Sequence, residues 1–218
     1  MNNMNSRVCA RINLGAVEKN ILAMKNNIPE GTRIMAVIKT DAYGHGAVEI
    51  GRFLEDKDYI WGYATATAEE AFELRDAGIR KPILVLGYTF PYAYERMLTE
   101  GIRPAVFRTD MAEKLSECGQ DLMARGILKE APPVHIAVDT GMSRIGITPD
   151  EAGVSFAKEV RLMSGIHIEA CSRTSQGQMR RTLPMSGSVK RCSRSSFPTL
   201  KRRQAIGYPS DTAPTVPA

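Results

Sequence analysis

A lysine, a tyrosine and an arginine stand in two polar strings that each follow an apolar run. The first string is KTDAYGHG, residues 39–46, directly after RIMAVI, and the second is DTGMSRIG, residues 139–146, after VHIAV. A lysine at the end of a buried strand is partly desolvated, which favours the neutral amine that a Schiff base requires. Arg144 carries a planar, permanently charged guanidinium that can bind a carboxylate or a phenolate oxygen. These residue types therefore predict amine chemistry at Lys39 and anion binding at Arg144.

Taken singly, the residues of these strings have plainer interpretations. A lysine after a strand is usually an exposed side chain, and His45 is more often a loop histidine than an acid–base group. Asp139 can simply cap a turn, and Gly44 and Gly46 can be turn residues, although they also let the backbone pass close to a ligand. Tyr43 offers a hydroxyl as a hydrogen-bond donor. The complete strings, rather than any one residue, carry the functional prediction.

The elements that must position these strings alternate between short apolar runs and longer amphipathic ones. A repeat of this kind predicts a parallel sheet with right-handed crossovers, in which the chemistry lies at the carboxyl ends of the strands. We expect strands at 33–38, 60–64, 83–87, 103–107 and 134–139, with a sixth from 165. We expect helices at 47–56, 67–78, 92–101, 110–126 and 149–163. Asp110 is expected as a helix N-cap, and Gly78 and Gly126 as helix stops.

Both an open doubly wound sheet and a (β/α)8 barrel agree with this α/β pattern. The first strand is not followed by G-x-G-x-x-G, and the sequence contains no P-loop, which disfavours dinucleotide-binding and NTPase folds. A closed barrel needs eight strands and typically about 250 residues. We therefore expect an incomplete (β/α)8-type barrel of about six strands.

Composition and charge exclude several classes of protein. The 218 residues are 43% apolar, as in globular domains, and no apolar run approaches the roughly 20 residues that span a bilayer. The net charge is +5, yet residues 170–218 hold nine basic residues and one acid, so residues 1–169 hold 20 basic and 23 acidic residues. The basic tail has only Phe197 and Tyr208 as aromatic residues, which is not typical of a nucleic-acid-binding face. We expect neither nucleic acid nor membrane as a partner.

The amino-terminal residues and the cysteines indicate the compartment. The opening MNNMNSR has no apolar core, and the four cysteines lie far apart without a CxxC pair. We therefore expect a cytoplasmic protein with reduced thiols and no metal site.

Three strings resemble the alanine racemase family. AVIKTDAYGHGAVEIGRFLE, residues 36–55, is similar nearly residue for residue to the segment that carries the family's cofactor lysine. HIAVDTGMSRIG, residues 135–146, resembles the family's second signature, and INLGAVEKNI, residues 12–21, resembles its usual opening. The strings occur in family order, and they identify residues 7–169 as a partial barrel domain that binds pyridoxal 5'-phosphate (PLP).

The resemblance implies an isomerase that interconverts L- and D-alanine for cell-wall precursors, as a homodimer with a β domain after the barrel. Carried over by position, Lys39 would be the PLP-linked lysine and one of two bases. Tyr43 would bind the cofactor phosphate, Val37 would pack near its ring, and Arg144 would bind its phenolic oxygen and the substrate carboxylate. Ala137 departs from the family, in which many members carry a carbamylated lysine there, so Arg144 is expected to be held less firmly.

The resemblance stops after Glu169. Residues 170–218 have no helical or alternating period, so we expect a disordered basic tail. If the codons from Ala170 onward are read from each codon's third base, CSRTSQGQMRR and its flanks can encode LFTHFARADEAD, and DTAPTVPA can encode HSTNSAG, both similar to family strings. We hypothesise a single-nucleotide deletion near the codon for Ala170. The nucleotide sequence from codon 165 onward tests this, and early stop codons in the shifted frame would exclude it.

On this interpretation the chain lacks the β domain with its tyrosine base, and we expect no alanine racemisation from the 218 residues alone. The alternatives are a racemase that prefers serine, another barrel-type PLP enzyme such as an amino-acid decarboxylase, and a non-catalytic PLP-binding protein whose tail binds an acidic partner. The AYGHG string favours alanine racemase over the decarboxylases. Protection of the tail from proteases by an acidic partner would favour the non-catalytic protein.

Overall fold

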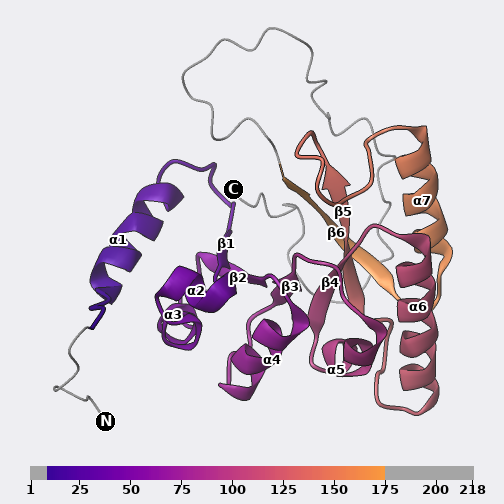
Figure 1. The fold of residues 1–218 in the computed structure, drawn as a ribbon, viewed down its shortest axis with the longest axis horizontal. Coiled ribbons are helices and arrows are strands. Elements are labelled where there is room, and N and C mark those ends of the chain that lie inside the picture. The colour runs from indigo at the N-terminus through magenta and orange to yellow at the C-terminus, as the bar shows by residue number, and fades with distance from the viewer. Residues whose placement is uncertain (1–8, 175–218) are drawn as a thin grey trace, which may run out of the picture.

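The computed structural model describes residues 9–174, which form six parallel strands that lie side by side in chain order. The row of strands is curled into part of a barrel, and the helices α3 to α7 follow one side of it (Figure 1). The strands are β1 (Ile34–Val37), β2 (Ile60–Thr65), β3 (Ile83–Val85), β4 (Ile102–Val106), β5 (Pro133–Asp139) and β6 (His167–Thr174). The expected incomplete α/β barrel of about six strands is therefore confirmed.

The helices lie between the strands in sequence, as the alternating pattern predicts. They are α1 (Leu14–Lys25), α2 (Lys39–Gly44), α3 (Ala47–Leu54), α4 (Ala68–Asp76), the 3-10 helix η1 (Pro91–Ala93), α5 (Tyr94–Thr99), α6 (Thr109–Ala124) and α7 (Glu151–Leu162). The strand β6 continues past Glu169, because residues 170–174 pair with β5 from His135 to Asp139. The rest of the expected tail, residues 175–218, lies outside the described residues, so its disorder and its altered reading frame stay predictions.

Both faces of the sheet are buried, which is why its strands read as almost unbroken apolar runs. Between sheet and helices lies a core of large side chains, in which Leu54, Tyr63 and Ile83 are fully buried. The concave face carries a second, smaller set: Met35, Ala64, Leu84, Ala105 and Ala137, with Val37, Trp61, Leu86 and Phe107 packed against them.

Tyr63 fixes the position of α3 on the outer face of the sheet. Its hydroxyl donates to the carbonyl of Gly51 at 2.7 Å and to Glu55 Oε2 at 3.2 Å. Burial, followed by the neighbouring Glu55 carboxylate, raises the pKa of the Tyr63 hydroxyl, so this donor stays protonated. The other oxygen of Glu55 accepts the backbone N–H groups of Arg80 at 2.8 Å and Lys81 at 2.9 Å. These bonds connect α3 to β2 and to the segment before β3.

A charged cluster joins three strands near their amino ends, opposite to the end where catalysis is expected. Glu169 accepts hydrogen bonds from Arg103 Nε and from His135 Nε2, each at 3.0 Å. The guanidinium of Arg103 lies over the ring of Trp61, 5.7 Å from its centroid. Burial raises the pKa of Glu169, but the bonds from His135 and Arg103 outweigh it and lower this pKa from 4.5 to about 2.

Stability at acid pH is expected to depend on this carboxylate. Because its folded-state pKa is depressed, Glu169 contributes stability above about pH 4.5, and the contribution is lost as the pH falls towards about 2. Glu169→Gln should destabilise the protein at neutral pH by about 1–2 kcal/mol, a value reduced for partial exposure to solvent. Urea unfolding across this pH range checks it, with the exposed Glu159→Gln as control. A difference from wild type that stays constant down to pH 2 would contradict the assignment.

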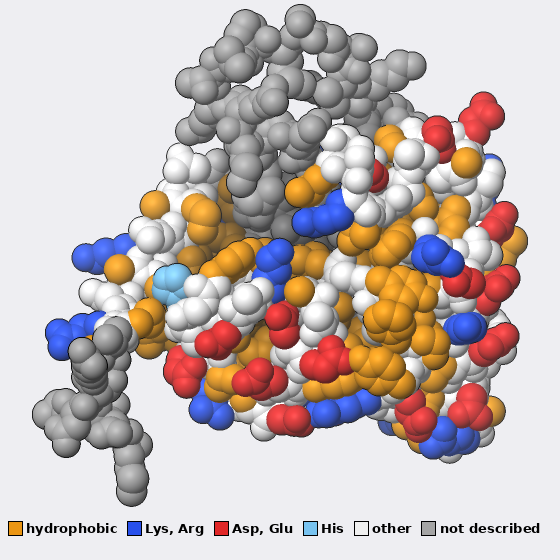
Figure 2. Space-filling model, viewed as in Figure 1, with side chains coloured by type: hydrophobic (Ala, Val, Ile, Leu, Met, Phe, Trp, Pro, Cys, Tyr) orange, Lys and Arg blue, Asp and Glu red, His pale blue; other side chains and the backbone are white. Residues whose placement is uncertain are grey.

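The surface of the described part carries both signs of charge. On the face shown in Figure 2, acidic and basic side chains are interspersed over the helices. Among residues 9–174, no helix is both long enough and apolar enough to cross a membrane.

Candidate functional site

The candidate site lies at the carboxyl end of β1. The strand is followed by Ile38, whose N–H donates to the carbonyl of Ala64 in β2 at 2.9 Å, and Lys39 follows at once as the first residue of α2. The Lys39 side chain is half-buried, and its Nζ lies 5.9 Å from the centroid of the Tyr43 ring. Tyr43 is 60% exposed. The two predicted residues therefore lie together, with the amine over the face of the phenol.

The turn that carries Lys39 is left-handed. Thr40, Asp41, Ala42 and Tyr43 have φ angles of 53°, 52°, 51° and 56°, with ψ between 37° and 51°. Left-handed backbone costs an L-residue roughly 1–2 kcal/mol, and non-glycine residues normally adopt it singly. Four in succession therefore indicate stored strain of the kind found at functional sites.

Hydrogen bonds from outside and inside the turn hold this conformation. The Thr40 N–H donates to Glu70 Oε1 at 2.8 Å, and the other oxygen, Oε2, accepts the Ala66 N–H at 2.7 Å. Asp41 Oδ1 accepts the Ala47 N–H at 2.7 Å, which joins the turn to the start of α3. Asp41 thus holds the turn locally, whereas Glu70, thirty positions after Thr40, supplies the tertiary contact.

Arg144 lies on a loop after β5, at the same end of the sheet. Asp139 Oδ1 accepts three backbone N–H groups of this loop, from Gly141 and Met142 at 2.9 Å and from Ser143 at 3.1 Å. These bonds, from Ser143 first and then Gly141, hold the pKa of the Asp139 carboxyl below its usual value. Asp139 does cap a turn, as its plainer interpretation proposed, and the turn it caps presents Arg144.

The loop returns to β5 through a close backbone contact. Gly146 has a φ of 118°, and a Cβ there would lie 2.6 Å from the backbone nitrogen of Asp139. The next residue, Ile147, donates to the carbonyl of Ala137 and accepts from the N–H of Asp139, both at 2.9 Å. A glycine is required at position 146 for this reason.

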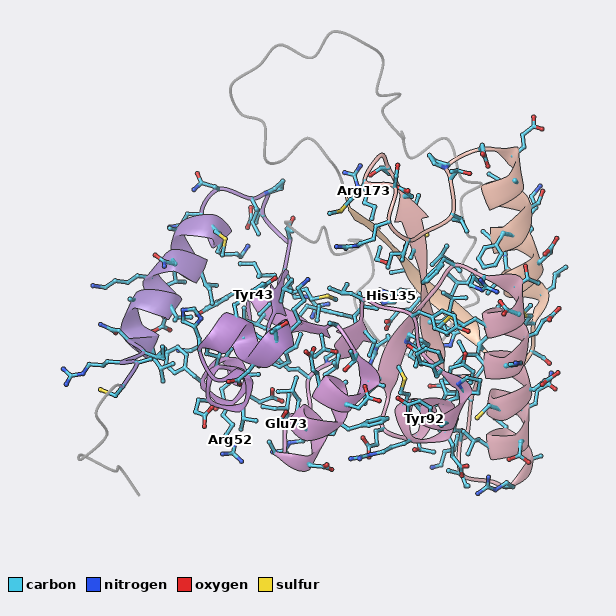
Figure 3. The ribbon with its side chains drawn as sticks, viewed as in Figure 1. Tyr43, Arg52, Glu73, Tyr92, His135 and Arg173 are labelled. Carbon is cyan, nitrogen blue, oxygen red and sulfur yellow. The ribbon has the colours of Figure 1, made fainter. Side chains whose placement is uncertain are left out.

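The predicted site residues are distributed over two places at this end of the sheet. Val37 ends β1, two positions before Lys39, and packs against the concave apolar set. Arg144 is exposed on the loop after β5, and β5 is separated from β1 by three strands in the sheet. In Figure 3 Tyr43 is seen on α2, Arg173 lies near the end of β6 beside the β5 loop, and His135 lies within the sheet.

Two side chains that hold the site were missed from the sequence. Asp41 stands inside the first polar string and Glu70 in the helix expected at 67–78, and neither was expected to contribute to the site. The signal for Glu70 was the spacing T-x-x-E at 67–70, which is typical of a capping box. Thr67 is indeed the N-cap of α4 and accepts the Glu70 N–H at 3.4 Å, but the Glu70 side chain reaches Ala66 and Thr40.

The groups at this edge agree in type with an aldehyde-bearing, anionic ligand. Lys39 supplies an amine, Tyr43 a hydroxyl donor and Arg144 a permanent positive charge, and Val37 at the end of β1 belongs to the apolar set of the concave face. Among the described residues, no group of three or more His, Cys, Asp or Glu side chains could hold a metal ion.

Comparisons with known proteins show the family to which the chain is similar. Residues 12–172 match the family described as alanine racemase, N-terminal domain. The chain is 39% identical over 149 residues to alanine racemase 2 of Oceanobacillus iheyensis, covering 67% of this chain and 36% of the relative. It is 39% identical over 166 residues to an alanine racemase of Desulforamulus reducens, covering 76% of this chain and 43% of the relative. The solved alanine racemase of Clostridium difficile 630 superimposes with a TM-score of 0.68 at 37% identity, over 74% of this chain and 41% of that one. The chain thus spans less than half the length of these relatives.

Proposed function

Because the chain belongs to the alanine racemase N-terminal domain family, we propose that it binds PLP through Lys39 and supplies the cofactor side of an amino-acid racemase site. The observation that carries the proposal is the place of Lys39. It leaves the end of a buried strand on a strained, tightly held turn, with its amine over the Tyr43 ring. Such a setting restricts where the amine can lie, which is what a covalent cofactor link requires.

The residues at this edge suit PLP by type. When bound, PLP withdraws electrons from the α-carbon of an amino acid and so weakens its C–H bond. Lys39 would hold the cofactor's carbonyl carbon and move a proton at the α-carbon through Nζ. The Tyr43 hydroxyl would donate to the phosphate, Val37 would bound the ring, and Arg144 would pair with the phenolic oxygen and the substrate carboxylate.

The remaining parts of the proposal rest on the names of the relatives. Alanine racemases among them favour alanine as the substrate and the supply of D-alanine as the role. A homodimer and a cytoplasmic location belong to the same proposal. A racemase that prefers serine is the second candidate, because the residues at this edge recognise groups that all amino acids share.

Covalent labelling tests the proposal. The chain is incubated with PLP, reduced with borohydride and digested, and the pyridoxyl group is located by peptide mapping. We expect it on Lys39, since the strand and the turn fix the backbone from which this amine extends. Lys39→Ala should abolish the label while leaving folding intact. A label mainly on Lys19, Lys25 or Lys57 would disprove the assignment.

A further inference from the structure

The Lys39 turn needs an external restraint, because its own backbone disfavours it. Only Lys39 lies between Ile38, which is bonded to β2, and Thr40, the first of the four left-handed residues. The peptide that joins Lys39 to Thr40 therefore sets the direction in which the Lys39 side chain leaves the sheet. Whatever fixes the N–H of Thr40 also fixes that peptide.

Glu70 is the side chain that fixes it. Its Oε1 accepts the Thr40 N–H at 2.8 Å, and its Oε2 accepts the Ala66 N–H at 2.7 Å. Ala66 follows β2, the neighbour of β1, so one carboxylate joins the ends of two adjacent strands. Glu70 is itself placed by the first turn of α4, where Thr67 accepts its N–H. The Glu70 side chain is therefore positioned by α4 and by its bond to Ala66 at the end of β2, in addition to its bond to the turn.

We propose that Glu70 is a positioning residue for Lys39, holding the cofactor-binding turn through Thr40. The inference rests on the proposed function, since it concerns the direction of the amine that would bind PLP. A carboxylate is needed because both backbone groups are donors and each takes one acceptor oxygen. A glutamine has one carbonyl oxygen, so it can keep one of the two hydrogen bonds and loses the other.

Three variants of the 218-residue chain test the proposal: Glu70→Ala, Glu70→Gln and, as matched control, Glu69→Ala. Glu69 precedes Glu70 in the same first turn of α4, and its carboxylate contacts the Tyr92 hydroxyl instead of the Lys39 turn. Each alanine variant removes one negative charge from the same helix end. Any general effect of charge on the helix is therefore shared by Glu69→Ala and Glu70→Ala.

The first measurement is amide hydrogen exchange at Thr40 and Ala66, which needs no cofactor. We expect exchange at both amides to accelerate roughly tenfold in Glu70→Ala and to stay unchanged in Glu69→Ala. The second measurement is the rate of borohydride-trapped pyridoxyl labelling at Lys39, relative to Lys19 and Lys57. It should fall roughly tenfold or more in Glu70→Ala, to an intermediate level in Glu70→Gln, and not at all in Glu69→Ala.

The outcomes separate this inference from the proposed function. Wild-type labelling at Lys39 together with equal labelling in Glu70→Ala would overturn the positioning role and leave the cofactor assignment standing. If the unaltered chain is not labelled preferentially at Lys39, the proposed function fails, and the positioning role falls with it. Should Glu70→Ala not fold, Glu70→Gln decides: undiminished labelling at Lys39 overturns the role, and selective loss at Lys39 with the other lysines unchanged supports it.

Discussion

Gly119→Ala, which adds one methyl group, is expected to destabilise the protein by about 3 kcal/mol. This value is in the upper part of the range for overpacking. Gly119 lies inside α6, and a Cβ there would lie 1.9 Å from the carbonyl oxygen of Gly165 and 2.9 Å from its carbon. Both obstructing atoms belong to the backbone and cannot rotate away. The helix α6 would have to move off the loop before β6, where the Gly165 N–H also donates to Ser116 Oγ at 3.2 Å.

The matched control is the same substitution at Gly15, inside α1. There the nearest atom to a new Cβ is Asn13 Oδ1 at 3.3 Å, the end of the side chain that caps α1 through the Ala16 N–H, and it need shift only slightly. Alanine has the higher helix propensity by about 1 kcal/mol at both positions, so propensity cannot explain a difference between them. Urea unfolding should find Gly15→Ala neutral or slightly more stable than wild type and Gly119→Ala far less stable. Equal stability of the two variants would show that α6 does not approach the loop so closely.

The second large effect is expected in the left-handed turn, where Ala42→Pro should remove both the turn and the labelling of Lys39. Ala42 has a φ of 51°, and its N–H donates to the carbonyl of Ile38 at 3.0 Å. Proline fixes φ near −65° and has no N–H, so it loses the hydrogen bond and cannot adopt the angle. We expect a cost of at least about 3 kcal/mol, as in the interior of an ordinary helix.

The effect of Ala42→Gly on stability distinguishes a left-handed turn from an ordinary right-handed helix. In a right-handed helix the change costs about 1 kcal/mol, but glycine adopts left-handed backbone without steric penalty. Glycine would relieve about 1–2 kcal/mol of backbone strain at this position, which offsets the loss of the buried methyl group. Ala42→Gly should therefore lie close to wild type in stability. Thermal unfolding and PLP labelling of both variants check the pair. A glycine variant much less stable than wild type, with a proline variant that still labels at Lys39, would contradict the left-handed assignment.

The strands could be predicted because burial on both faces leaves a plain signal in the sequence. RIMAVI contains β1, and VHIAVD lies wholly within β5, because most residues packed on either side of a parallel strand are apolar. The ends of the helices leave a weaker signal in the sequence than the strands do. Asp110 was expected as the N-cap of α6, but the helix begins at Thr109 with Arg108 as N-cap, and Asp110 forms an ion pair with Arg108 at 2.9 Å. An aspartate in the first turn and an aspartate at the cap give the same local pattern.

The handedness of the site turn could not be predicted from local sequence. Gly44 and Gly46 do have positive φ, as expected of turn residues, but the four residues before them are non-glycine and disfavour it. Besides Asp41 within the turn, they are held by the carboxylate of Glu70, thirty positions after Thr40, so part of the signal lies outside the turn. The position of Arg144 was predictable as a loop after a strand, whereas its support by Asp139 depended on which turn that loop adopts.

The order of the strands, which is their order in the chain, bears on how the protein folds as it is synthesised. Paired residues in neighbouring strands are separated by 19 positions between Ile83 and Ile102, and by 35 between His135 and Ala170. Every strand after the first therefore meets a neighbour that has already left the ribosome, and no pairing has to wait for a later strand. Pairing in chain order favours folding that proceeds from the amino terminus. The Lys39 turn, whose restraints end at Glu70, can be complete before most of the barrel exists.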